Sequence, residues 1–360
     1  MVLFYDVAGA FNAVWWPLVL RKLKQMQIPR DIYRLLVDYF SDRTAIMQCQ
    51  EGQATTSITR GCPQGSVLGA AAWNIVFSDL LDRLEGLQVR AFAYVDDLAV
   101  IIEASSRERV KSLAESISLF IAEWCKQARL ELATNKTTAI VFKGAGDVRH
   151  PMRIVIDGFR IQAVNSTRYL GVFIHQKLKP DTHIAQLVER ISQLAKEMRN
   201  LSGVNSGAPY FRRLQYYKTV FLPVVLYGAP TWWDRPTKLN RNRILSIQRA
   251  VLIALTRSYV TASTLALQVL AGCPPLDLVL DARVAWTSVT WPERTSVRVD
   301  TDLASTLQSQ PDPKEREKIV TSWLHAKWQE RWDEGSTGRL THSFIPNTEE
   351  GVKMRFLDRG

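Results

Sequence analysis

The sequence feature that most constrains the fold is a pair of adjacent aspartates between two short apolar runs. Residues 89–95 and 98–102 have the composition of β-strands, and Asp96 and Asp97 stand between them. Asp tolerates the backbone angles of turns, so the two runs predict a hairpin that lifts both carboxylates to its tip. Residues 2–5 form another apolar strand, which ends at Asp6. Placed side by side, these strands would bring three carboxylates to one edge of a sheet.

Three carboxylates at one edge repel each other unless a cation lies among them. Hard divalent cations suit such oxygen ligands, and Mg²⁺ keeps coordination positions open for phosphate oxygens. The sequence therefore makes Asp6, Asp96 and Asp97 candidate ligands of a catalytic metal site. An Asp-Asp pair in a turn is more often part of a solvated loop, so this hypothesis depends on the rest of the chain.

The charge balance favours a polyanionic partner. The chain carries 46 Lys and Arg against 35 Asp and Glu, a net charge of +11, and its sequence pI is about 9.6. Such an excess fits nucleic acid or an acidic membrane surface. No apolar run reaches transmembrane length, which argues against a membrane. The four cysteines show no CxxC spacing, so they predict reduced thiols in an intracellular protein.

Much of the positive charge falls in one region. Between residues 186 and 260 there are twelve basic residues and three acidic ones, with tyrosine, phenylalanine and tryptophan interleaved. This pattern predicts a nucleic-acid-binding surface. The alternative, a helical domain with aromatics in its core and arginines in solvent, stays open. The candidate contacts are Arg212, Arg213, Arg241, Arg243 and Arg249.

Between the first strand and the Asp-Asp hairpin lies a shaped loop, residues 60–66, with two glycines and a proline. Ser66 is placed to cap a helix that runs to about Leu84, and a helix N-terminus behind a glycine loop suits a nucleotide or anion. A plain turn before a helix is the alternative. Through residue 175 strands and helices mix in an α+β order. We expect three regions: residues 1–175, a basic helical region at 176–260, and a C-terminal helical region with a tail at 261–360.

Five motifs occur in the order of the reverse-transcriptase palm motifs, and together they resemble those of non-LTR retrotransposons. They are residues 6–11, residues 60–66, Tyr94-Val95-Asp96-Asp97, Asn135-Lys136-Thr137 and Tyr169-Leu170-Gly171. Residues 11–17, 60–67, 73–74 and 224–257 are similar to the type-1 elements inserted in insect ribosomal RNA genes. The resemblance covers nearly the whole chain. It departs from the family at Asn12, Val95 and Gly69, and none of these removes a metal ligand.

The resemblance implies a polymerase palm, an antiparallel sheet with helices on one face, followed by a mostly helical thumb-like and C-terminal region. It implies catalytic and metal-binding roles for Asp6, Asp96 and Asp97 with two Mg²⁺ ions, and makes Lys136 a candidate proton donor to the leaving pyrophosphate. The nucleotide and template contacts that it implies are Phe11, under the incoming sugar, with Arg60, Gln64 and Gly65. The implied primer-gripping hairpin contains Tyr169, Leu170 and Gly171. For Phe11, a place in the core under the turn is the alternative.

The function implied is RNA-directed DNA polymerisation by a retrotransposable element. The implied partners are an RNA template, a DNA primer at a nicked chromosomal target, and deoxynucleoside triphosphates, with no membrane; the implied location is the nucleus. We expect the chain to be a fragment that lacks the fingers and endonuclease regions, and no residue here can be assigned to the parent element's nicking activity. An RNA-dependent RNA polymerase, an intron maturase and a non-catalytic nucleic-acid-binding remnant are the alternatives.

Overall fold

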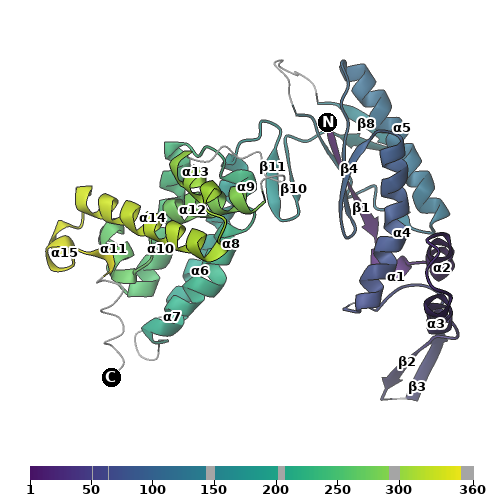
Figure 1. Cartoon of the computed structure of the whole chain (residues 1–360), viewed down its shortest axis with the longest axis horizontal. Helices are drawn as coiled ribbons and strands as arrows, with labels where there is room; N and C mark the ends of the chain where they lie inside the picture. Colours follow the sequence, from purple (N-terminus) through teal and green to yellow (C-terminus); the bar gives the residue numbers. More distant parts are fainter. Residues whose placement is uncertain (51, 64, 143–150, 202–206, 292–300, 350–360) are drawn as a thin grey trace. The chain divides into compact units, whose positions relative to one another are not determined.

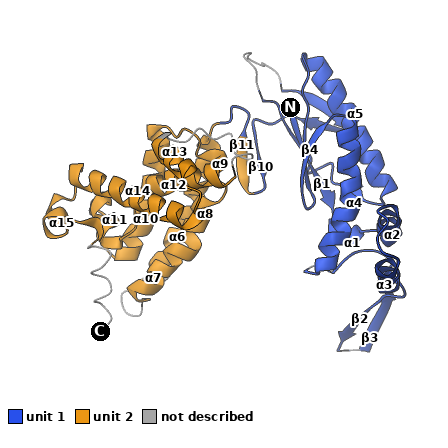
Figure 2. Cartoon of the chain, in the orientation of Figure 1, with its two compact units in different colours: residues 1–170, 175–178 blue, residues 171–174, 179–360 orange. Residues whose placement is uncertain are grey.

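The computed structural model describes residues 1–50, 52–63, 65–142, 151–201, 207–291 and 301–349. The chain divides into two compact units, residues 1–170 with 175–178 and residues 171–174 with 179–360 (Figure 2). The first unit mixes strands and helices, and the second is mostly helical (Figure 1). The predicted fold class is confirmed.

The first unit is built on an antiparallel sheet in the strand order β4-β5-β1-β6, in which β7 also pairs with β1. The strands of the first unit are β1 Val2–Ala8, β2 Thr44–Cys49, β3 Gly52–Ser57, β4 Arg90–Tyr94, β5 Asp97–Ile101, β6 Glu131–Leu132, β7 Thr138–Ile140, β8 Arg153–Ile156, β9 Phe159–Gln162 and β10 Ser166–Tyr169. Strands β2 with β3 and β8 with β9 form separate two-stranded sheets. The central strand β1 is thus paired on both sides, which fixes its register.

The helices of the first unit are α1 Ala10–Ala13, α2 Trp16–Gln25, α3 Arg30–Phe40, α4 Val67–Gly86 and α5 Arg107–Gln127. Helices α4 and α5 cover one face of the sheet, whereas α1 and α2 pack on α4 and α3 packs on α2. Alternate residues of β1, Leu3, Tyr5 and Val7, are buried in the same apolar cluster as Trp73 of α4 and Ile121 of α5. The Tyr5 hydroxyl lies 2.8 Å from the Ser118 hydroxyl of α5. Because the middle of β1 is buried under these helices, the polar residues of the candidate site lie at the ends of the strands.

The predicted cap at Ser66 is confirmed, and a second serine caps the other long helix of this unit. The Ser66 hydroxyl accepts from the Gly69 N–H at the start of α4, and the Ser106 hydroxyl accepts from the Arg109 N–H at the start of α5. A side-chain oxygen at these positions satisfies an amide that the first helical turn leaves unbonded. The cap of α4 fixes where the glycine loop ends and the helix begins.

The second unit contains strand β11 Val172–His175, most of which belongs to it, and a set of packed helices. The helices are α6 Asp181–Leu201, α7 Tyr210–Tyr216, the π-helix η1 Tyr217–Phe221, α8 Leu222–Leu226, α9 Ala229–Trp232, α10 Lys238–Thr256, α11 Thr264–Ala271, α12 Leu276–Thr290, α13 Thr301–Ser309, α14 Pro313–Glu334 and α15 Arg339–Phe344. Its core joins α6, α10 and α12 through Ile191, Leu252 and Leu280, all nearly fully buried. Many aromatics of the basic region lie in this core, Tyr217 and Trp233 among them.

In the part of the chain that the structure describes, no single helix has the length and hydropathy to span a membrane. Helices α11 and α12 meet those limits only as a pair bent by 64°, by length and composition alone.

Candidate active site

Three aspartates converge at one end of the central strands. Asp6 near the end of β1 is the register partner of Asp97, the first residue of β5. Tyr94 also pairs with Asp97, which closes a two-residue turn made of Val95 and Asp96. Only Asp96 therefore lies at the tip of the hairpin, whereas the sequence placed both carboxylates there. The three residues come together because β1 and β5 are neighbours in the sheet.

The negative charge at this edge changes the titration of one carboxyl. Burial raises the pKa of Asp97 above its ordinary value of 3.8, and the charges of Asp96 and Asp6 raise it further. Two like charges within interaction range disfavour a third, which a positive group nearby would relieve.

Lys136 supplies one positive group to this edge. Its ammonium lies 2.8 Å from Asp6 Oδ2, and that bond, with the charge of Asp6, raises the pKa of Lys136. The loop that carries Lys136 is tied to the same strand, because the Ala133 N–H donates to the Asp6 carbonyl at 2.9 Å. The structure therefore brings Lys136 to the carboxylates, and its role as a proton donor stays a prediction.

The carboxylate oxygens are suitable donors for a hard cation, although they do not form a complete cage. Within the described residues, no group of three His, Cys, Asp or Glu side chains could hold a metal ion. Mg²⁺ is usually bound by only one or two carboxylates, with water and substrate phosphates in its other positions. The donor set of Asp6 and Asp96 fits that kind of site.

The glycine loop lies against the turn that follows β1. The Cys62 N–H donates to the Phe11 carbonyl at 2.7 Å, and the Gly61 N–H donates to the Val14 carbonyl at 2.8 Å. Gly61 has φ +91°, and a Cβ there would lie 2.9 Å from the Asn12 carbonyl oxygen. This close approach requires glycine. The loop is therefore fixed to the segment that directly follows the strand carrying Asp6.

The predicted nucleotide and template residues lie around this loop. Phe11 is half-buried, with its ring centroid 6.3 Å from that of Trp73. Arg60 is exposed, and Gly65 has φ +81° with open space around it. Gln64 lies outside the described residues. The roles of these residues remain predictions.

The predicted primer hairpin begins beside the same sheet. The ring of Tyr169 packs on Phe4 of β1, with centroids 4.7 Å apart. Burial raises the pKa of Tyr169, and the charge of Asp97 adds to the shift. Leu170 and Gly171, which follow Tyr169, have φ +45° and +80°. Positive φ at two successive residues makes the tight turn that the motif predicts.

The five candidate arginines of the second unit differ in their surroundings. Arg212 is exposed. Arg243 makes a partly exposed pair with Asp181 at 3.5 Å, an interaction that is weak in water. The remaining three are committed to partners inside the unit. Binding of phosphate stays a prediction for all five, and the two with solvent-facing guanidinium groups are better placed for it.

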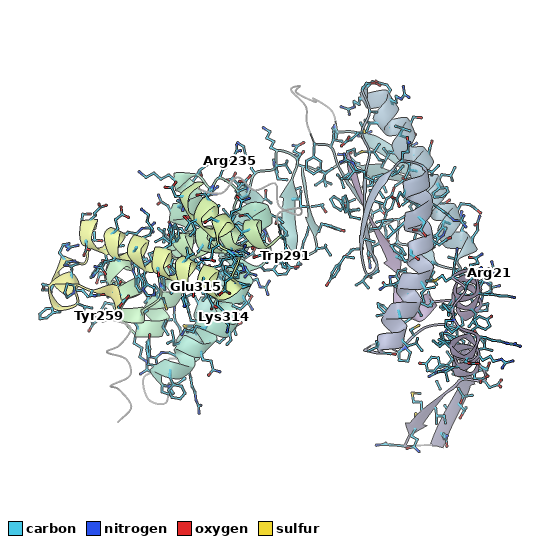
Figure 3. The ribbon with its side chains drawn as sticks, viewed as in Figure 1. Arg21, Arg235, Tyr259, Trp291, Lys314 and Glu315 are labelled. Atoms are coloured by element: carbon cyan, nitrogen blue, oxygen red, sulfur yellow. The ribbon has the colours of Figure 1, made fainter. Side chains whose placement is uncertain are left out.

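The three committed arginines hold the unit together. Arg213 is buried and donates to the Leu255 carbonyl at 2.9 Å. Arg241 bonds Asp281 at 2.6 Å. Arg249 donates to the carbonyls of Val260 and Ala262, both at 2.6 Å, and so fixes the loop whose exposed Tyr259 is labelled in Figure 3. Removing one of these guanidinium groups would disturb the fold as well as any surface charge.

Sequence reasoning missed two tryptophans that fasten the site's loops. The Trp73 indole N–H donates to the Val95 carbonyl at 2.7 Å, and the Trp16 indole N–H donates to the Gly61 carbonyl at 2.7 Å. Trp73 enters the sequence argument only as part of a resemblance. Both bonds join distant parts of the chain, so no local spacing could indicate them.

An antiparallel sheet that sets aspartates on two neighbouring strands, beside a glycine loop and a capped helix, is a polymerase palm. The family described as "Reverse transcriptase (RNA-dependent DNA polymerase)" matches residues 1–174. A Pol polyprotein from the type-1 retrotransposable element R1 of Nasonia vitripennis is 32% identical over 297 residues, which cover 79% of this chain and 85% of that protein. The chain belongs to the reverse transcriptases of type-1 retrotransposable elements. Reverse transcriptases as a family are metal-dependent.

A second relative is much longer than this chain. A 115 kDa protein of the type-1 retrotransposable element R1DM from Drosophila melanogaster is 32% identical over 348 residues, covering 95% of this chain and 33% of that protein. The chain thus spans about a third of that relative's length. Among solved structures, telomerase from Candida tropicalis with a fragment of telomeric RNA matches with TM-score 0.36 and 12% identity, over 90% of this chain and 48% of that one. A likeness this distant adds nothing to the assignment.

Proposed function

We propose that this protein is an RNA-directed DNA polymerase of a retrotransposable element. The observation that carries the proposal is the strand register that sets Asp6 against Asp97, in a chain that belongs to the reverse transcriptases. The template would be the element's RNA, and the substrates would be deoxynucleoside triphosphates. The primer would be a DNA 3′ end at a nicked chromosomal target, which implies action in the nucleus.

Two of the three aspartates would supply the protein ligands of the metal ions in this reaction. Asp6 and Asp96 would bind two Mg²⁺ ions with Asp97 beside them, and water and phosphate oxygens would complete the coordination. When bound, the two ions lower the pKa of the primer 3′-hydroxyl and offset the charge of the leaving pyrophosphate. Lys136, whose ammonium lies 2.8 Å from Asp6 Oδ2, is the candidate donor of a proton to the pyrophosphate oxygen.

The remaining site residues would orient the substrates. The half-buried ring of Phe11 follows β1 by a few residues, where it would pack against the sugar of the incoming nucleotide. Arg60 and Gly65 of the glycine loop, with Gln64 between them in sequence, would contact the template and the nucleotide. The turn at Leu170 and Gly171 would hold the primer strand, with Tyr169 packed on the sheet behind it.

The test replaces one metal ligand in the complete protein. Asp96→Asn should abolish DNA synthesis on an RNA template and leave the melting temperature nearly unchanged, because Asp96 lies in a turn. Asp82→Asn, which makes the same charge change at an exposed position of α4, is the control and should keep wild-type synthesis. Synthesis by Asp96→Asn near the wild-type rate would exclude Asp96 from the mechanism. Wild-type extension with ribonucleotides in preference to deoxynucleotides would instead indicate an RNA polymerase.

A further inference from the structure

The turn that carries the catalytic aspartates contains a backbone conformation that its residue disfavours. Val95 has φ +57°, in a region that β-branched side chains rarely adopt. Strain of this kind persists only where the surrounding structure holds it, and it concentrates at functional sites. The side chain of Val95 is 41% exposed, so side-chain packing alone is a weak restraint on the turn.

One buried side chain reaches this turn from outside the hairpin. Trp73 lies on α4, which contacts β4 (Figure 1), and it is only 1% exposed. Its indole N–H donates to the Val95 carbonyl at 2.7 Å. The bond therefore acts on the peptide between Val95 and Asp96, the candidate metal ligand.

The same indole lies behind the residue proposed to face the sugar. The Phe11 and Trp73 rings are stacked, with centroids 6.3 Å apart and planes at 29°. Phe77 also stacks on Trp73, at 5.0 Å and 23°, and Trp124 meets Phe77 edge-on at 6.0 Å. Trp73 thus has little room to move, and its position is set by the helical core.

The helix that carries Trp73 is itself anchored. Asp79, two turns further along α4, accepts from the Trp124 indole at 2.8 Å and pairs with Lys22 of α2 and with Arg83. The bonds to Lys22 and Trp124 tie α4 to α2 and α5. A rigid support is what a side chain needs to hold another residue in a strained position.

We infer that Trp73 is a positioning residue for the polymerase reaction, with two separable actions. Its N–H holds the strained turn so that Asp96 keeps its place beside Asp6. Its ring packs against Phe11 and so keeps the Phe11 ring in position against the sugar of the incoming nucleotide. The effects on catalysis that this inference predicts rest on the proposed polymerase function. The competing view is that Trp73 only fills the core, in which case its loss lowers stability without a selective effect on the site.

Three variants separate these views. Trp73→Phe keeps an aromatic ring against Phe11 and removes the N–H, whereas Trp73→Leu removes both. Trp124→Phe is the matched control, because Trp124 is also a buried tryptophan of the same core whose indole N–H makes one hydrogen bond. Trp73→Phe and Trp124→Phe should lower the melting temperature by similar amounts, and Trp73→Leu should lower it more because it leaves a larger cavity.

The catalytic readouts are kcat, KM and the choice of sugar in primer extension by the complete protein. For Trp73→Phe, kcat should fall about 3- to 10-fold, the equivalent of one hydrogen bond, with little change in the deoxynucleotide KM. Its preference for deoxynucleotides over ribonucleotides should match the wild type. Trp73→Leu should show the same fall in kcat and, in addition, a preference weakened by about 10-fold or more, as the unsupported ring of Phe11 yields to the 2′-hydroxyl. Trp124→Phe should change neither kcat nor the preference, because its ring can still meet Phe77 and Asp79 keeps its pairs with Lys22 and Arg83.

A second readout needs no activity. Hydrogen exchange of the backbone amides at residues 94–98, measured on the 360-residue chain, should become about 10-fold faster in Trp73→Phe and stay at the wild-type rate in Trp124→Phe. Equal exchange at this turn in the two variants would overturn the inference, as would equal kcat. If the wild-type protein makes no DNA while the exchange difference is present, the proposed function fails and the positioning role of Trp73 stands.

Discussion

Substitution of Arg241 tests whether the arginines of the basic region are available to bind nucleic acid or are already paired with carboxylates of the protein. Arg241 bonds both carboxylate oxygens of Asp281, at 2.6 and 3.2 Å, and approaches Asp277 at 3.4 Å. Its guanidinium also lies 5.6 Å from the centroid of the Trp233 ring. We predict that Arg241→Gln destabilises the second unit and leaves the salt dependence of RNA binding unchanged.

The size of the effect follows from what the substitution leaves behind. Breaking a fully buried ion pair by removing one partner costs about 3–5 kcal/mol. The Arg241 side chain is 34% exposed, and Asp281 keeps its bond from the Trp233 indole at 2.8 Å. Solvent and that bond reduce the expected loss to about 2–3 kcal/mol. Asp277 is less affected, because Arg331 still binds it at 2.7 and 3.0 Å.

The assay pairs thermal melting with RNA binding over a range of salt concentrations. For a unit of this size, a loss of about 2–3 kcal/mol lowers the melting temperature by about 4–12 °C. Arg212→Gln is the matched control, since Arg212 carries the same charge on an exposed side chain. It should leave the melting temperature unchanged and, if it contacts a phosphate, lower the log–log salt slope by about 0.7 to 0.9.

The opposite pattern would refute this reasoning. Suppose that Arg241→Gln lowers the log–log salt slope by about 0.7 to 0.9, the change expected for one phosphate contact, and that the unit melts as the wild type does. Arg241 would then contact nucleic acid at the surface, and its bonds to Asp281 would contribute little to stability. Neutralising Arg241, Arg243 and Arg249 together could not separate these cases, because two of the three also hold the fold.

Three further outcomes are expected. Phe11→Ala should raise ribonucleotide incorporation by orders of magnitude with a modest loss of deoxynucleotide use, measured as the ratio of catalytic efficiencies; an unchanged ratio with a stability loss of about 3–5 kcal/mol would make Phe11 a core residue. In thermal melting, Gly61→Ala should destabilise the first unit more than Gly65→Ala does. Both glycines have positive φ, but only at Gly61 would a Cβ lie 2.9 Å from a backbone oxygen. Equal losses of melting temperature would show that φ alone sets the cost. Burial lowers the pKa of His183 to about 4, from 6.5, so the unfolded chain binds a proton that the folded unit excludes between these values. His183 therefore costs no stability above pH 6.5 and up to about 3 kcal/mol as the pH falls to 4. The melting temperature of His183→Gln should accordingly fall less than that of the wild type over this range. Parallel curves of melting temperature against pH for the two proteins would contradict this expectation.

The local elements of the site were predictable from nearby residues. The hairpin around Asp96, the Ser66 cap and the glycine loop each depend on residues within one or two turns of chain, where propensity and capping act. The position of Asp97 was predicted less well. Its exact place depends on a two-residue turn closed by the pairing of Tyr94 with Asp97, and composition does not fix the register of a strand.

The amino-acid order alone was sufficient for the palm motifs, the fold class and the net positive charge of residues 186–260. The folded structure decided which of those charges face solvent, because the partners of Arg241 lie 36 and 40 residues away on α12. It also joined Lys136 to Asp6 across 130 residues and Trp73 to Val95 across 22. A hydrogen bond or ion pair depends on distance in space, and residues far apart in the chain become neighbours only when burial of the core packs helix against sheet.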